Sequence, residues 1–259
     1  MSGAVPQTKI EQLADRLFPL RVADQTELQK VHLDLHQLNE RKPGDPTTLL
    51  FLARVLALLG RRGEALSKLG GAYSLRKQLD RSRLNILAII YAWLGDYERS
   101  REIYDGFVFE DEGKVSGNHL DNAARTAVLL GDLDYLTHIR DESQDAIEKG
   151  ADTHCANEFL SAIEASEASK FFPIYQRAVA DVVRGHQVWV NPTVFSDGDL
   201  MLLTVEYVVT VQDRRALERT VFDAAEKAAT EAGVRPSCLL PHIDTELRTV
   251  PLAGLQAVA

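Results

Sequence analysis

Three groups of residues in this chain have side chains that could bind a metal ion or attack a substrate. His32 and His36 are four residues apart on an expected helix, which is the spacing of a two-histidine metal site. No glutamate stands beside the first histidine and no third ligand is evident, so we expect both rings to face solvent. His154 and Cys155 form a possible nucleophile pair, but neighbouring residues on a helix point in different directions.

The third group lies towards the C-terminus, where nitrogen and oxygen ligands could converge on a metal. Its members are His186, Asp197, Asp199, His242 and Asp244. We expect the first two aspartates to form a turn and His242 to lie in coil instead. The sequence has no GxxxxGK phosphate loop, no GxGxxG after a strand and no CxxC metal motif. We therefore predict no catalytic residue, no metal site and no cofactor.

A repeated motif indicates how most of the chain is organised. A Leu-Gly pair ends three apolar segments, and its glycines, at positions 60, 95 and 131, are 35 and 36 residues apart. An alanine stands seven residues before each glycine, among apolar residues spaced as on one face of a helix. Glycine adopts the left-handed conformation that ends many helices, and Asp96 and Asp132 can cap the helix that follows. The motif predicts helix pairs joined by tight turns.

The second copy of the motif resembles a tetratricopeptide repeat (TPR). The matching residues are Leu84, Leu87, Ala88, Tyr91, Leu94, Gly95, Asp96, Tyr97, Glu98 and Tyr104. The first copy matches through Ala65, Leu69 and Ala72, whereas the third departs at Leu136 and Arg140. The resemblance covers residues 46–148 and implies a TPR-like α-solenoid, in which helix pairs stack on their neighbours. The alternative is an unrelated helix bundle.

In TPR arrays the first helix of each pair lines a concave groove. The resemblance implies that these partner-binding positions are Phe51, Arg54, Leu58, Asn85, Ile89, Trp93, Asn118, Asp121, Asn122 and Arg125. Asparagine can satisfy a peptide backbone, and arginine can form paired hydrogen bonds with a carboxylate. The lysines and asparagines of the family's carboxylate clamp are not reproduced, so chaperone tails are not implied as partners. The alternative is that these polar residues only solvate a helix face.

The helical pattern continues on both sides of the repeats and ends near Gly185. We expect flanking helices over residues 7–18, 25–39, 152–165 and 169–184, and the longest polar connection over residues 109–118. Pro173 fits only within the first turn of its helix. The prediction is a TPR-like helical domain over residues 1–185 and a small α+β domain over residues 186–259.

The pattern of residues 186–259 predicts a β-hairpin followed by one long helix. Apolar residues alternate on both sides of an Asp197-Gly198 turn, and Pro192 places the first strand at an edge. Asp213 caps a helix over residues 214–232, whose small residues would let it lie close to a sheet. A short strand is expected over residues 238–240. Because few strands flank the apolar second strand, we expect its open edge to be covered, with a homodimer as one solution.

Composition limits the possible partners and the compartment. The chain of 259 residues has a net charge of −9 and no basic segment, which argues against nucleic acid or an anionic membrane as its main partner. No apolar run approaches the roughly 20 residues needed to cross a bilayer. The first residues lack the pattern of a signal peptide. We expect a cytoplasmic protein whose cysteines, Cys155 and Cys238, are reduced.

These observations favour a non-enzymatic interaction or scaffold protein that binds a segment of another protein in a TPR-like groove. Short acidic TPR proteins of bacterial type III secretion look similar, so a secretion-type chaperone is an alternative. The α+β extension departs from that family. A third possibility is an enzyme with its site in the C-terminal domain.

Overall fold

A computed structural model describes residues 8–106, 116–148, 150–165, 171–197, 200–211, 213–233 and 243–249. Within these ranges the chain is mainly helical, with eleven α-helices and one small three-stranded sheet. It divides into two compact units, residues 1–90 and 91–259, which we call the N-terminal and C-terminal units. The division falls inside helix α5 (Arg81–Trp93), and the domain boundary predicted at Gly185 lies within the C-terminal unit.

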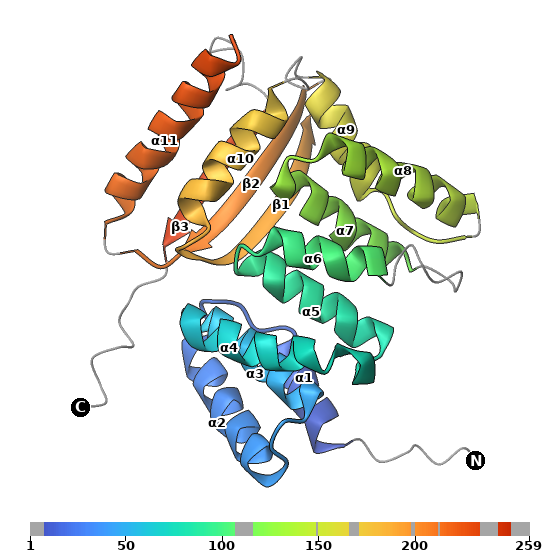
Figure 1. Ribbon diagram of the computed structural model, residues 1–259, viewed down its shortest axis with the longest axis vertical. Helices are drawn as coiled ribbons and strands as arrows, with labels where there is room; N and C mark the ends of the chain where they lie inside the picture. The colour runs from blue at the N-terminus through green and yellow to red at the C-terminus, as the bar shows by residue number, and fades with distance from the viewer. Residues whose placement is uncertain are drawn as a thin grey trace. The chain divides into compact units, whose positions relative to one another are not determined.

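The N-terminal unit is built around one helix. This central helix is α3 (Pro46–Leu58). The other helices of the unit are α1 (Lys9–Leu17), α2 (Gln25–Arg41), α4 (Arg62–Ser74), the short 3-10 helix η1 (Arg76–Gln78) and the first part of α5. Helices α1, α2 and α4 all contact α3 (Figure 1). Almost every residue of α3 is buried. Its sequence is apolar on every side, and a helix of that kind is stable only when it is surrounded.

The C-terminal unit contains the last part of α5 and six further helices. These are α6 (Tyr97–Tyr104), α7 (Gly117–Leu130), α8 (Leu133–Glu148), α9 (Cys155–Ala165), α10 (Phe172–Val183) and α11 (Arg214–Glu231). Helix α7 contacts α6, α8, α9 and α10, so it forms the centre of this unit. Pro173 lies in the first turn of α10, as predicted.

The sheet of the C-terminal unit has the order β1-β2-β3. The predicted hairpin is confirmed: β1 (Gln187–Asp197) pairs antiparallel with β2 (Leu200–Val209), and Pro192 lies on an edge strand. The third strand, β3 (Ile243–Thr249), runs parallel to β2 and was not predicted. Charged residues do alternate along it with Ile243, Thr245 and Leu247, but the segment is short and a proline stands close to each of its ends. The strand expected over residues 238–240 lies outside the described residues.

Both edges of β2 are paired within the chain. The predicted homodimer depended on an open edge of this strand, and β3 occupies that edge along Leu203 to Val209. The reason for expecting self-association through β2 is therefore removed.

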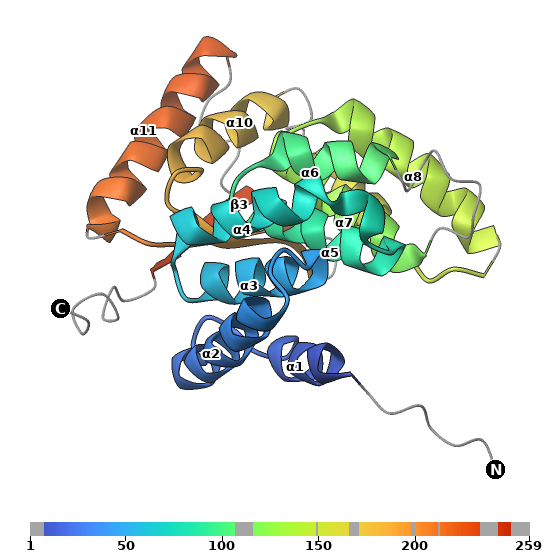
Figure 2. The same cartoon turned by 60° about the horizontal axis from the view of Figure 1, so that its bottom comes forward.

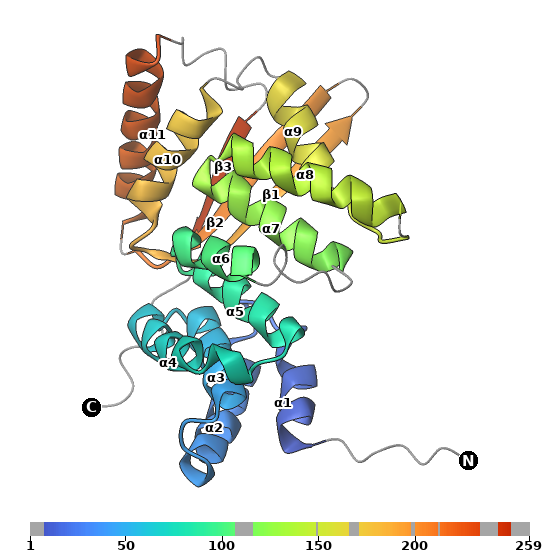
Figure 3. The same cartoon turned by 45° about the vertical axis from the view of Figure 1, so that its right-hand side comes forward.

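One face of the sheet is covered by helices. Leu203, Val205, Tyr207 and Val209 point to this face as predicted and are fully buried. Helices α7, α9 and α10 lie on the same side of the sheet in Figures 1 and 3, and Gln176 of α10 donates a hydrogen bond of 2.7 Å to the Tyr207 hydroxyl. The helices and the sheet thus share one core.

Helix α11 does not take the position that its sequence predicted. We expected its small residues to pack on a sheet, but α11 lies alongside α10 and only touches β3 (Figure 2). Its buried side chains are Leu217, Val221, Ala228 and Ala229, whereas Ala232 is exposed. The small residues therefore allow a close approach between two helices.

The three Leu-Gly turns have the same hydrogen bonds. In each, the residue after the glycine donates its backbone N–H to a carbonyl five residues earlier: Arg61 to Leu56 at 2.9 Å, Asp96 to Tyr91 at 2.9 Å and Asp132 to Ala127 at 3.0 Å. The glycines have φ values of 76°, 79° and 61°. This is the Schellman arrangement, and it confirms the predicted tight turns.

The residues around these turns also have the predicted roles. Ala53, Ala88 and Ala124 are fully buried. The Asp96 carboxylate accepts from the Arg99 backbone N–H at 3.2 Å, and Asp132 caps α8 in the same way. The sequence motif therefore specifies the local structure at both ends of the turn.

Candidate functional site

The predicted groove positions divide between the two units. Phe51, Arg54, Leu58, Asn85 and Ile89 belong to the N-terminal unit, and the other predicted positions belong to the C-terminal unit.

In the N-terminal unit, the predicted groove residues on α3 are buried against residues that follow α1. The Arg54 guanidinium lies 4.8 Å from the centre of the Phe18 ring and donates a hydrogen bond of 3.3 Å to the Phe18 carbonyl. Phe51 meets the same ring edge-on at 5.9 Å. Burial, and then the charge of Arg21, lower the pKa of Arg54 to about 10. These side chains hold the chain after α1 against α3.

The remaining N-terminal positions lie on α5 and differ in exposure. Asn85 is buried and Ile89 is half-buried. An amide buried to this extent is positioned to stabilise the fold, since a partner could reach it only after neighbouring atoms moved.

In the C-terminal unit, the predicted positions form a polar stripe along α7. Asn118 is exposed, and Asp121, Asn122 and Arg125 are half-buried. Their spacing of three and four residues places them on one face of the helix. Trp93, at the end of α5, is also half-buried. The structure therefore brings together four of the predicted residues on a single helix.

Asp121 has a structural role at the start of α9. Its Oδ1 accepts hydrogen bonds from the Thr153 hydroxyl at 2.8 Å, the Cys155 backbone N–H at 3.1 Å and the His154 backbone N–H at 3.3 Å. The first N–H groups of a helix have no partner inside the helix. A carboxylate from α7 thus caps α9 and fixes the segment that precedes it.

Arg125 connects the same stripe to a thiol on α9. Its Nη2 lies 3.8 Å from Cys155 Sγ, and its Nη1 donates to Asn122 Oδ1 at 3.3 Å. Burial raises the pKa of the Cys155 thiol to about 12; the Arg125 charge acts in the opposite direction, and Asp121 adds to the rise. Because the thiolate is the nucleophile, this thiol is poorly suited to nucleophilic catalysis near neutral pH.

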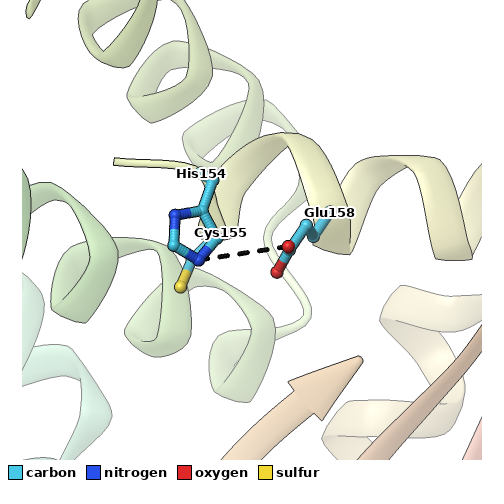
Figure 4. Close-up of side chains that lie close together, drawn as sticks. All are labelled: His154, Cys155 and Glu158. Atoms are coloured by element: carbon cyan, nitrogen blue, oxygen red, sulfur yellow. Dashed lines mark ion pairs between the residues drawn. The ribbon is translucent and has the colours of Figure 1, made fainter. Parts of the chain in front are cut away.

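His154, Cys155 and Glu158 bring three different donor groups together at the start of α9 (Figure 4). One ligand atom from each side chain lies within 4.8 Å of the other two. The prediction that His154 and Cys155 point apart is wrong, because His154 precedes the helix and helical geometry does not apply to it. Glu158 lies one turn further on, so the H-C-x-x-E spacing was the signal available in the sequence.

The other metal candidates do not form a comparable group. The His32 and His36 rings are 6.2 Å apart, and His36 faces Glu40 at 3.4 Å. Burial lowers the pKa of His32. In the third predicted group, His186 is exposed. Its other four members, and the cysteine at position 238, have side chains outside the part that the structure describes.

A charged cavity of about 280 Å³ lies between the ends of α6 and α7 and helix α10. Its charged lining residues are Glu98, Asp132, Arg177, Asp181 and Arg184. Arg184 pairs with Glu98 at 3.1 Å, and Asp132 pairs with Arg101 at 2.7 Å. Arg177 also donates a hydrogen bond from its Nε to the Leu130 carbonyl at 3.4 Å. The Glu98–Arg184 and Arg177–Leu130 contacts join α10 and the residue after it to the neighbouring helices.

No protein-family model, curated protein or solved structure matches the chain. Among the described helices, none has both the length and the apolar character of a membrane-spanning helix. Helix α7 holds most of the predicted groove residues of the C-terminal unit, and the three metal-ligand side chains lie at the start of α9.

Proposed function

We propose that this chain is a non-enzymatic interaction protein of the TPR-like α-solenoid kind, which binds a segment of a partner protein. The observation that carries the proposal is the mutual packing of the consecutive helices α7, α8 and α9. In a helical repeat each helix contacts the next helix and the one after it. The Schellman turn between α7 and α8 and the buried Ala124 support the same interpretation.

The proposed contact surface is the polar face of α7. Asn118 is exposed, and Asn122 and Arg125 remain partly accessible beside it. The amides offer donors and acceptors to a peptide backbone, and the guanidinium suits a carboxylate. Asp121 supports this surface from within by fixing the start of α9.

We propose the cytoplasm as the compartment. Cys155 is a free thiol in the structure, and thiols persist in reducing compartments. Mass spectrometry of the protein isolated under alkylating conditions checks this: the thiol should be fully alkylated after denaturation without reductant.

Site-specific photo-cross-linking in the source cell tests the interaction. A photoreactive side chain at position 118 should capture a defined protein, whereas the same group at Gln144, which is exposed on α8, should not. The captured segment is then synthesised and titrated against purified protein. Loss of a charge-assisted hydrogen bond in Arg125→Ala should weaken binding by about 1.5–3 kcal/mol.

The control for the titration is Gln144→Ala, which should bind the segment as the parent protein does. Equal capture at positions 118 and 144, or equal affinity of Arg125→Ala and the parent protein, would overturn the proposal. Circular dichroism of each variant confirms that the helices are intact.

A further inference from the structure

The start of α9 has the donor set of a transition-metal site. His154 Nε2 lies 4.0 Å from a Glu158 carboxylate oxygen, and the Cys155 sulfur completes a triangle whose sides do not exceed 4.8 Å (Figure 4). An imidazole, a thiol and a carboxylate are the three side-chain types that Zn²⁺ binds in proteins. The three come from five consecutive residues: Cys155 and Glu158 lie one turn apart on α9, and His154 immediately precedes the helix.

We propose that His154, Cys155 and Glu158 bind one Zn²⁺ ion, with a water molecule in the fourth position. The ligand atoms are His154 Nε2, Cys155 Sγ and one Glu158 carboxylate oxygen. A zinc–sulfur bond forms as the thiol proton leaves for solvent. This site adjoins the proposed partner-binding surface through Arg125, but the proposal does not depend on the partner-binding function.

The residues around the triangle hold its members in place. Asp121 accepts from the backbone N–H groups of both His154 and Cys155, which fixes where the two side chains begin. The second imidazole nitrogen of His154, Nδ1, lies 4.0 Å from an oxygen of the fully exposed Asp152 carboxylate, which is beyond hydrogen-bond distance.

The ligands can reach bonding distance through small rotations. Zinc bonds of about 2.0–2.3 Å at tetrahedral angles place ligand atoms roughly 3.6 Å apart. The side chains of His154 and Glu158 are 60% and 49% exposed, so both can turn towards the sulfur without displacing neighbours. The sulfur is the fixed point, since Cys155 is buried and lies against Arg125.

The surrounding charge and the donor types favour zinc. Asp121, Asp152 and Glu158 supply three carboxylates near the site, against one guanidinium from Arg125. That guanidinium can remain as a hydrogen-bond donor to the bound sulfur. Mg²⁺ and Ca²⁺ prefer an all-oxygen shell, whereas a mixed sulfur, nitrogen and oxygen set suits Zn²⁺.

Cobalt titration of the whole chain tests the site, because Co²⁺ replaces Zn²⁺ and a thiolate–cobalt bond absorbs in the near ultraviolet. One equivalent of Co²⁺ should produce this band, and Zn²⁺ should abolish it. Cys155→Ser should remove the band, whereas Cys238→Ser should leave it unchanged. The exposed-residue variants His154→Gln and Glu158→Gln, which do not disturb the core, should weaken binding about tenfold or more.

The matched control for Glu158→Gln is Glu164→Gln, an exposed glutamate on the same helix, which should bind Co²⁺ as the parent does. The proposal is overturned if no band appears, if the band survives in Cys155→Ser, or if Glu164→Gln weakens binding as much as Glu158→Gln does.

Discussion

Two glycines with positive φ, one in each unit, have different surroundings. In the N-terminal unit, Gly44 has a φ of 78°, and a Cβ added there would meet nothing within 4 Å. In the C-terminal unit, Gly131 has a φ of 61°, and a Cβ there would lie 2.9 Å from the Pro173 carbonyl oxygen. Gly95 is similarly close to Arg184. Gly44 therefore only sets a backbone conformation. Gly131 and Gly95 also lack the Cβ that would prevent the approach of α10 and the residue that follows it.

The cores of the units differ in their polar content as well. In the C-terminal unit, buried Gln187 of β1 accepts from the Tyr97 hydroxyl at 2.7 Å and donates to the Ala92 carbonyl at 2.6 Å. Gln176 and Tyr207 make a second buried bond between helix and sheet. In the N-terminal unit, the buried polar residues are Thr48, Arg54 and Asn85, and the other buried side chains that the structure describes are apolar. Directional bonds fix how the sheet meets the helices, which apolar contacts alone leave loosely specified.

The largest loss of stability is expected at Gly131, which both adopts a left-handed conformation and permits the close approach of α10. Gly131→Ala adds left-handed strain and a clash with the Pro173 backbone, and should destabilise the protein by about 2–4 kcal/mol. Gly44→Ala adds strain only and should cost roughly 1–2 kcal/mol. Chemical denaturation gives the two values, and hydrogen exchange assigns each loss to its unit. Equal losses of stability in the two variants would contradict the additional role of Gly131 in packing.

The buried alanines of the repeat test whether the two units are packed equally tightly. Ala88→Leu in the N-terminal unit and Ala124→Leu in the C-terminal unit both insert a larger side chain where no exposed surface remains. Each should cost about 1–3 kcal/mol. Thermal unfolding measures the change, and an unaltered midpoint for either variant would mean that its alanine is not at a tight helix contact. Gln144→Leu on the surface of α8 serves as the neutral reference.

The buried hydrogen bond between Tyr97 and Gln187 should contribute less to stability than the glycine and alanine contacts do. Tyr97→Phe removes the donor to Gln187 and leaves a buried amide oxygen without it, at an expected cost of about 1–2 kcal/mol. The double variant Tyr97→Phe with Gln187→Met should cost less than the sum of the single changes, because the two groups interact. Strict additivity in denaturation experiments would show that the bond adds no stability.

The smallest effect concerns the acid stability of the N-terminal unit. Burial acts to raise the pKa of Asp45, but hydrogen bonds from Lys42 and Thr48 outweigh it and hold that pKa below its usual value. A lowered pKa stabilises the fold above the unfolded value of about 3.9, and this contribution disappears as pH falls through the folded value.

Asp45→Asn removes this titration and tests the argument. Between pH 7 and pH 3, the parent should lose about 0.5–1 kcal/mol more stability than the variant does, within the range of helix-cap contributions. Urea denaturation at both pH values provides the comparison, and a parallel loss in the two proteins would exclude Asp45 as a source of acid sensitivity.

Local features of the fold follow directly from the residues. The three Leu-Gly turns, the caps at Asp96 and Asp132 and the β-hairpin could be predicted, because each depends on backbone preferences within a few residues. The polar stripe on α7 could also be predicted, since helical spacing determines which residues share a face. Periodicity did not predict how much of each of these side chains is exposed.

The sequence alone therefore determined the helices, their turns and the hairpin. Only the tertiary structure decided that β3 pairs with β2, that α11 lies against α10, and that Asp121 caps α9 beside His154, Cys155 and Glu158. Each of these joins segments that are distant in the chain or that lie outside regular helix geometry. Such contacts depend on how buried surfaces fit together, and periodicity along the sequence carries no record of that fit.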